Sequence, residues 1–335
     1  MPQYHLPSKA PWADRFHRWA IRVWFPVLAD GAPRWPRWWQ QLHARWVIFV
    51  IMVVYPRPKR LIRKNLSRIM GLPARSWRVR RAVSAMFRHF AFYWVDLFRF
   101  AQLPPARMLE CHDGVRGNEH LEEAVAQGKG AVLLTAHLGN WELGGVLLSQ
   151  QELPVSIVYV KDAFADVERY RSFLRSQGEV EEIAISPGAA WSSLPVLRAL
   201  RAGRLVAMQG DRDFDGRGLP APFFGEMVRF PRGPFLVALL TGAPIVPAFV
   251  SYTPSYRFQA SFGEPIYVTS TGDRERDLQT AVEKWAAVLE TEIRRVPTQW
   301  YTFYDYFEKH RVRADEEASV VPGRVPRVPR RRASA

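Results

Sequence analysis

Two side chains five residues apart, His137 and Glu142, offer the clearest chemistry in the sequence. Histidine is the side chain most easily poised to accept a proton near neutral pH, and a carboxylate on its other ring nitrogen fixes the tautomer and stabilises the imidazolium. A turn between the two residues would let Glu142 reach His137. Because neither a serine nor an activated cysteine accompanies it, we expect His137 to deprotonate a substrate hydroxyl.

The residues around this pair predict a strand, a polar loop and then a helix. The segment 128–145, GKGAVLLTAHLGNWELGG, contains the apolar run AVLLT (131–135), which leads into His137. Ligands collect at strand ends in open α/β sheets, because the loops there project functional groups beyond the hydrogen-bonded layer. We therefore expect His137 and Glu142 to lie at the carboxyl end of a strand.

From about residue 113, short apolar runs alternate with helical segments, which is typical of a mixed β-sheet flanked by helices. We expect strands over residues 131–135, 155–160, 183–185, 205–209, 245–252 and 258–262, and helices over 141–150, 165–177, 190–202, 233–241 and 274–295. The pattern divides the chain into a helical, tryptophan-rich region (1–112), an α/β core (113–310) and a disordered tail rich in proline and arginine (311–335). Within the first region, residues 77–100 show an amphipathic helical stripe.

Basic charge and tryptophan are concentrated together in the first third of the chain. The 335 residues include 47 Lys and Arg against 32 Asp and Glu, and residues 1–110 hold 20 of the basic residues with only 4 acidic ones. Nine of the thirteen tryptophans lie in the same third. Tryptophan favours the headgroup level of a bilayer, and anionic lipid attracts Lys and Arg. We therefore expect this region to bind an anionic membrane surface.

The apolar run at residues 46–55 is too short to span a bilayer, which takes ~20 residues. The start of the chain lacks a secretory signal pattern, and the single cysteine, Cys111, fits a reducing compartment. We expect peripheral or monotopic attachment on the cytoplasmic face of a membrane. An ordinary helical domain with buried tryptophans is the alternative. Nucleic acid is not an expected partner, because no recognition motif accompanies the basic charge.

The hexapeptide from His137 to Glu142, HLGNWE, resembles the His-x4-Asp/Glu signature of the glycerolipid acyltransferase superfamily. In particular it resembles the bacterial lipid A late acyltransferase (lauroyl/myristoyl) family, which also includes the phosphatidylinositol mannoside acyltransferases. The resemblance covers roughly residues 10–310. Its further motifs are Arg63-Lys64-Asn65-Leu66, Arg171 within ERYRSFLRSQG, Gly210-Asp211-Arg212-Asp213, Pro222-Phe223-Phe224-Gly225 and Gly233-Pro234.

The resemblance implies an acyltransferase-like core in an enzyme of the cell inner membrane. Such an enzyme moves a fatty acyl chain from an acyl carrier protein or coenzyme A thioester to a lipid hydroxyl, with no metal, no further cofactor and no covalent acyl-enzyme. It implies His137 as general base and Glu142 as its charge partner in a dyad. Arg171 and Asp211 match positions associated with substrate binding or with support of the site.

The implied acceptor is a glycolipid, in the first place a lipid A precursor. The sequence Gly210-Asp211-Arg212-Asp213 departs from the Asp-Gln pattern more usual in lipid A enzymes and is closer to the mannoside type. A phosphatidylinositol mannoside or a lysophospholipid therefore stays open as the acceptor.

Attack on a thioester forms a tetrahedral oxyanion that needs hydrogen-bond donors. Backbone N–H groups around Gly139 and Asn140, at the start of the predicted helix, would supply them. Arg171, Arg212 and Arg229 are candidates for binding phosphate, because guanidinium pairs bidentately with phosphate oxygens. Each arginine could instead have a structural role.

Phe223 and Phe224 either line an acyl site or anchor a turn in the core. Two other functions use the same residues: a hydrolase in which His137 activates water, and a membrane-binding protein without catalysis. Fold-level analogy does not separate these functions.

Overall fold

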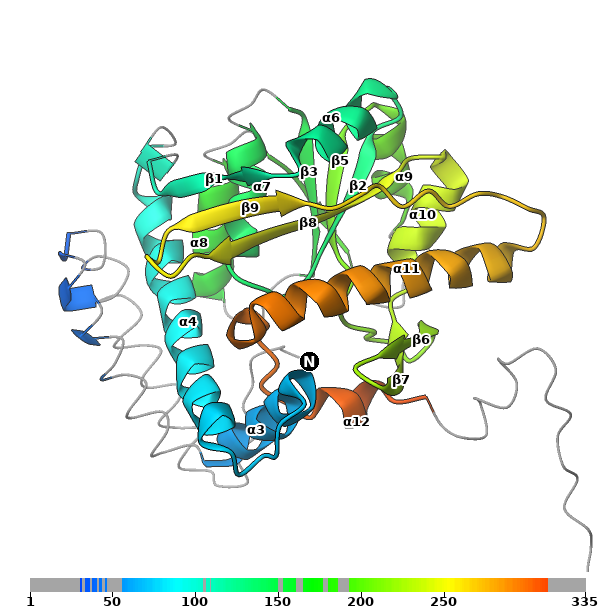
Figure 1. Ribbon diagram of the computed structural model, residues 1–335. Helices are drawn as coiled ribbons and strands as arrows, with labels where there is room; N and C mark the ends of the chain where they lie inside the picture. The colour runs from blue at the N-terminus through cyan, green and yellow to red at the C-terminus, as the bar shows by residue number, and fades with distance from the viewer. Residues whose placement is uncertain are drawn as a thin grey trace, which may run out of the picture.

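The computed structural model describes residues 56–104, 107, 108, 110–149, 153–160, 165–176, 180–185 and 193–312, with single residues between 31 and 46. Its centre is a seven-stranded sheet in the order β1-β9-β8-β2-β5-β3-β4 (Figure 1). The strands are β1 (His112–Arg116), β2 (Ala131–Thr135), β3 (Val155–Tyr159), β4 (Glu181–Ala184), β5 (Leu205–Gln209), β8 (Ile245–Tyr252) and β9 (Phe258–Phe262). The mixed α/β fold predicted from the sequence is confirmed.

Strand β2 lies in the middle of the sheet and pairs in parallel with both β5 and β8. The first four residues of its sequence AVLLT are apolar and buried, as expected for a strand covered on both faces. Helices α6 (Asn118–Ala126), α7 (Trp141–Ser149) and α8 (Ala165–Ser176) pack on one side of the sheet, and α9 (Leu194–Arg201), α10 (Gly233–Thr241) and α11 (Arg274–Arg295) on the other.

A two-stranded hairpin, β6 (Leu219–Phe223) and β7 (Glu226–Phe230), packs against α11. The chain then passes from α11 through a 3₁₀ turn, η2 (Pro297–Gln299), to the short helix α12 (Tyr306–His310). Arg311 bridges to Val228, and the Val312 N–H donates to the Met227 carbonyl. Arg311 and Val312, which the sequence pattern assigned to the tail, therefore contact the hairpin, and residues 313–335 lie outside the described part.

Two helices from the basic first third, α3 (Pro56–Met70) and α4 (Trp77–Ala101), pack against the α/β core. Leu97 and Phe100 of α4 share one apolar cluster with Leu143 of α7 and Val250 of β8. Helix α4 confirms the amphipathic helix predicted over 77–100. Its apolar face is thus part of the same core that supports the sheet.

No described helix is both long enough and apolar enough to cross a membrane. The apolar run at residues 46–55 lies outside the described residues apart from Trp46, which is exposed together with Trp38 and Trp39.

Candidate active site

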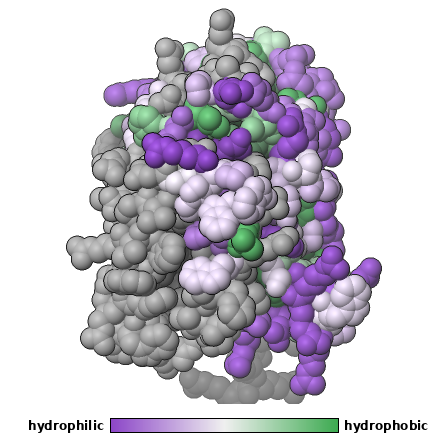
Figure 2. All heavy atoms as spheres, turned by 90° about the vertical axis from the view of Figure 1, so that its left-hand side faces the viewer, coloured by the Kyte–Doolittle hydropathy of each residue, from purple (hydrophilic) through white to green (hydrophobic). Residues whose placement is uncertain are grey.

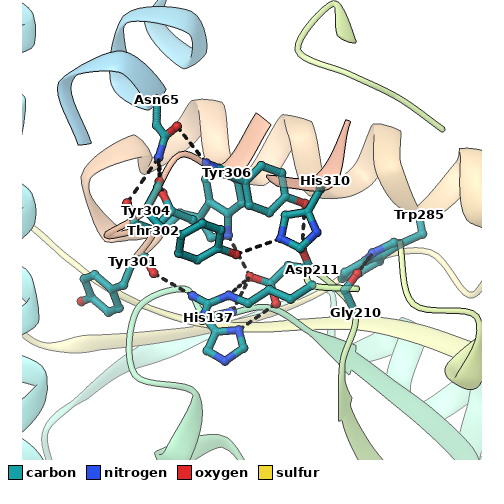
Figure 3. Close-up of polar contacts among 12 residues, drawn as sticks. Asn65, His137, Gly210, Asp211, Trp285, Tyr301, Thr302, Tyr304, Tyr306 and His310 are labelled. Atoms are coloured by element: carbon teal, nitrogen blue, oxygen red, sulfur yellow. Dashed lines mark hydrogen bonds and ion pairs between the residues drawn. The ribbon is translucent and has the colours of Figure 1, made fainter. Parts of the chain in front are cut away.

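The loops that follow β2 and β5 bring His137 and Asp211 together. Thr135 and Gln209 are register partners at the ends of these neighbouring parallel strands. The loops that follow the two strands therefore leave the sheet at the same edge. Nδ1 of His137 lies 2.8 Å from Oδ1 of Asp211, and the His137 backbone N–H donates to Oδ2 at 3.2 Å (Figure 3). Both side chains are buried.

The sequence predicted that Glu142 is the carboxylate partner of His137, but in the structure Glu142 contacts two arginines instead. Glu142 lies in the first turn of α7, where its carboxylate faces α8. Its Oε1 is 3.3 Å from Nε of Arg171, and its Oε2 is 3.1 Å from Nη2 of Arg175. Asp211, which the resemblance associated with substrate binding or with support of the site, contacts Nδ1 instead. The catalytic roles of these residues stay predictions.

Burial is the main cause that lowers the pKa of His137, and the positive charges of Arg212 and Arg171 add to it, while Asp211 opposes the shift. The imidazole is therefore neutral near pH 7 and can accept a proton. Burial would raise the pKa of Asp211, yet the hydrogen bond with His137, the charge of Arg212 and the N–H of Trp300 hold it well below its ordinary value. Asp211 is thus ionised beside a neutral imidazole.

Glu142 is ionised for a different reason. Burial opposes the charge, but Arg175 and Arg171 lower the pKa of Glu142 below its ordinary value. Arg175 also faces Glu168 and Glu182, at 3.6 Å and 3.5 Å. This buried network ties α7 to α8.

The two amides predicted to stabilise an oxyanion are already used within the protein. The Gly139 N–H donates to the Gln299 carbonyl, and the Asn140 N–H donates to the Val250 carbonyl, both at 2.9 Å. This prediction is therefore wrong for these two N–H groups. Gly139 is required sterically, because it has a φ of 61° and a Cβ would lie 2.0 Å from the Val250 oxygen.

The three arginines proposed for phosphate binding make internal contacts. Arg171 donates to the Tyr93 hydroxyl at 3.0 Å as well as facing Glu142. Arg212 donates to the Tyr301 carbonyl at 2.7 Å, and Arg229 to the Gly218 carbonyl at 2.9 Å. These contacts favour the structural alternative.

Phe223 and Phe224 belong to the largest apolar cluster, at the turn between β6 and β7. The ring of Phe223 packs against Phe230 and Trp300 with centroids 5.2 Å and 5.8 Å away. Of the two alternatives for these residues, the structure favours the turn anchored in the core.

Sequence reasoning missed an apolar pocket between α7 and the sheet. Trp141 lines it, and the centroid of the Trp141 ring is 5.3 Å from that of His137, so one residue of the pocket wall packs against the candidate base. Several of its lining residues are small: Gly144 and Gly145 of α7, Ala207 of β5, Ala248 of β8 and Ala260 of β9. The consecutive glycines inside a predicted helix were the signal that could have indicated it.

Comparison with known proteins places this geometry in context. A family model described as bacterial lipid A biosynthesis acyltransferase matches residues 37–309. Two proteins of Mycobacterium tuberculosis strains, both named phosphatidylinositol mannoside acyltransferase, are 31% identical over 56% of this chain and 59% of their own length. A protein of the same name from Mycolicibacterium smegmatis is 28% identical over 72% of this chain and 76% of its own length. The chain thus spans about six tenths of the two tuberculosis relatives it matches.

Proposed function

Because the chain belongs to the family of bacterial lipid A biosynthesis acyltransferases, we propose that it transfers a fatty acyl chain from a thioester to a hydroxyl group of a membrane glycolipid. The observation that carries this proposal is the buried, neutral His137, hydrogen-bonded at Nδ1 to the ionised Asp211 and adjacent to an apolar pocket. These are a base, the group that stabilises its charged form, and space for a hydrocarbon chain.

In the proposed reaction, Nε2 of His137 accepts the proton of the acceptor hydroxyl as the oxygen attacks the thioester carbonyl. Asp211 stabilises the imidazolium that forms, through the Nδ1–H hydrogen bond. The new C–O bond forms and the C–S bond breaks, and the proton returns to the thiolate that leaves. The reaction needs only its two substrates, and we propose no metal or further cofactor.

We propose that the acyl chain occupies the pocket under α7. Its lining is mainly apolar and includes Leu133, Leu148 and Val250. Burying a hydrocarbon chain there stabilises the complex by ~0.8 kcal/mol per methylene group.

Two glycolipids have support as the acceptor. The family description favours a lipid A precursor, and the names of the relatives favour a phosphatidylinositol mannoside. The donor is an acyl carrier protein or coenzyme A thioester. We propose that the protein works at the cytoplasmic face of the inner membrane, attached peripherally or monotopically through its basic first third.

The test is mass spectrometry of membrane lipids from cells that express either the natural chain or His137→Ala at equal levels. We expect one glycolipid class to lose one acyl group in the variant, because removal of a general base slows transfer by about 100- to 10,000-fold. The class identifies the acceptor, and the mass identifies the acyl chain.

The same pair of proteins, purified and incubated with acyl carrier protein and coenzyme A thioesters in turn, identifies the donor. Unchanged lipids with a folded, membrane-bound variant would refute the transferase. Release of free fatty acid without a lipid acceptor would instead indicate a hydrolase.

A further inference from the structure

The indole of Trp300 contacts the same carboxylate that holds His137. Trp300 follows η2, is fully buried, and donates its Nε1–H to Oδ2 of Asp211 at 3.0 Å. Tyr306 and Phe223 pack against the indole with ring centroids 4.6 Å and 5.8 Å away. Packing on two sides gives the indole little freedom to turn away.

The two carboxylate oxygens of Asp211 accept hydrogen bonds from different donors. Oδ1 contacts Nδ1 of His137, while Oδ2 accepts the His137 backbone N–H and the Trp300 indole N–H. Nε of Arg212 lies farther away, 3.6 Å from Oδ2. We propose that Trp300 is a positioning residue that acts through Asp211: its indole N–H binds the carboxylate and limits how strongly this carboxylate stabilises the imidazolium of His137. The proposal rests on the function proposed above for His137.

The direction of the effect follows from charge. Each N–H that binds a carboxylate withdraws part of its negative charge, so Nδ1–H experiences a weaker acceptor. Without the indole N–H, Asp211 would still be held by two contacts with His137 and would stabilise the imidazolium more strongly. The charged and titratable groups around the pair are Arg212 on the same loop, Arg171 on α8, Glu142 on α7 through Arg171, and Tyr304, Tyr306 and His310 on the segment after η2. Replacing Trp300 alters none of these charged or titratable residues themselves.

A segment at the end of the described chain fixes the position of Trp300. We call residues 299–312 the C-terminal strap. The Tyr301 N–H donates to the His137 carbonyl at 2.9 Å, and the Tyr306 hydroxyl donates to the Asp211 carbonyl at 2.7 Å. Asn65 of α3 donates to the Tyr304 carbonyl at 2.7 Å (Figure 3). The strap therefore carries Trp300 to Asp211 while it also binds both catalytic loops.

The test is Trp300→Phe, which removes the indole N–H and keeps an aromatic ring. The pKa of His137 is measured in the full-length protein by NMR of labelled histidine. We expect a rise of about 0.5 to 1 pH unit. The acid limb of kcat/KM should move to higher pH by the same amount, with KM unchanged.

The matched control is Trp285→Phe. Trp285 is also fully buried, and its Nε1–H donates to the Gly210 carbonyl at 2.9 Å, one residue from Asp211 but not on its carboxylate. This variant loses an indole hydrogen bond of the same kind, and the pKa of His137 should be unchanged in it. If Trp300→Phe does not fold, benzothienylalanine at position 300, in which sulfur replaces the N–H, preserves the shape.

An unchanged or lowered pKa of His137, or an equal rise in Trp285→Phe, would overturn the role of Trp300. Lack of transfer by the natural chain with every donor and acceptor would instead refute the proposed function, because the NMR titration does not depend on activity.

Discussion

Two buried carboxylates serve the site in different ways. Asp211 contacts the imidazole of His137, whereas Glu142 contacts the guanidinium groups of Arg171 and Arg175. In the proposed reaction, the first arrangement stabilises the charge that forms on His137 during proton transfer. The second neutralises charges that are present throughout, and so holds α7 against α8. Replacing Asp211 should therefore reduce kcat, whereas replacing Glu142 should reduce the stability of the fold.

Asp211→Asn should reduce kcat by about 100- to 10,000-fold with little loss of stability. The amide has nearly the same shape as the carboxylate but carries no charge, and its NH₂ group can donate to Nδ1 and place the ring proton on Nε2. His137 would then have no lone pair free at Nε2. Steady-state kinetics with a thioester donor measures the effect.

Asp213→Asn is the matched control for this change. The Asp213 carboxylate accepts the Gly218 and Asp215 N–H groups and is also buried, two residues from Asp211. A kcat within about tenfold of the natural value is expected there. Equal losses in both variants would contradict a specific role for Asp211.

Glu142→Gln should lower the free energy of unfolding by about 3 to 5 kcal/mol, because Arg171 and Arg175 would remain buried without their carboxylate. Urea unfolding measures the loss. Adding Arg175→Met should recover part of it, since the second change removes one of the uncompensated charges. Additive losses in the double variant would show that the two residues are not coupled.

Sequence spacing alone could not show which carboxylate, Asp211 or Glu142, contacts His137. Glu142 is five residues from His137, which suggested contact, yet the first turn of a helix directs it elsewhere. Asp211 is 74 residues away. It follows its strand by two residues, as His137 does, and only the pairing of β2 with β5 brings the two loops together. The sequence therefore identified the residues but not their contacts.

Among the elements, sequence patterning predicted most strands of the seven-stranded sheet. The bounds of β2, β5, β8 and β9 agree with the predictions, as do those of α10 and α11. Strands β1, β6 and β7 were missed. The sequence of β6, LPAPF, contains two prolines, which argue against a strand, and that of β1, HDGVR, is mainly polar. Both elements depend on tertiary contacts that the local sequence does not encode.

The turn from α3 into α4 forms a cationic surface. Arg75, Arg78, Arg80, Arg81 and Trp77 are exposed there, and no acidic residue occurs between Asp30 and Asp96. Figure 1 places this turn at the bottom of the molecule, and hydrophilic side chains project from the lower right of the face drawn in Figure 2. Arginine beside exposed tryptophan is suited to an anionic bilayer surface.

Replacing Arg78, Arg80 and Arg81 together by glutamine should weaken binding to vesicles that contain phosphatidylglycerol by about 100-fold, since each basic residue contributes about 1 kcal/mol near such a surface. Sedimentation with vesicles at a fixed salt concentration measures the change. The control replaces Arg198, Arg201 and Arg276, which are exposed on α9 and α11. Equal weakening in both triple variants would indicate that only net charge matters.

Across the whole molecule, the two ends of the described chain meet over the site. Asn65 near the start of this part binds the C-terminal strap, and its side-chain oxygen accepts the Tyr306 N–H. The strap in turn binds Asp211 and His137. Because segments from both ends of the described part contact the site or its neighbours, its geometry depends on how these segments pack together.

Acid should therefore destabilise the whole molecule through its buried histidines. Burial is the largest cause that lowers the pKa of His89 to about 4 and of His310 to about 3, and it also lowers that of His137. Above pH ~6.5 these groups are neutral in both states and add no pH dependence. Below that pH the unfolded chain takes up protons that the folded chain excludes, so stability falls by about 1.4 kcal/mol per pH unit for each histidine until its folded pKa is reached.

Urea unfolding at pH 8, 7, 6 and 5 measures this slope, and His310→Gln isolates one of the three contributions. The amide of glutamine can replace Nε2 in its contact with the Tyr304 hydroxyl, at 3.0 Å in the natural chain. The difference between the two proteins at pH 8 reports lost packing alone. Below pH 6.5 the stability of the variant should fall less steeply with decreasing pH. The variant takes up one proton fewer on unfolding, because no imidazole remains at position 310 to be charged. Parallel slopes from pH 8 to pH 5 would contradict the burial of a neutral His310 beneath the strap.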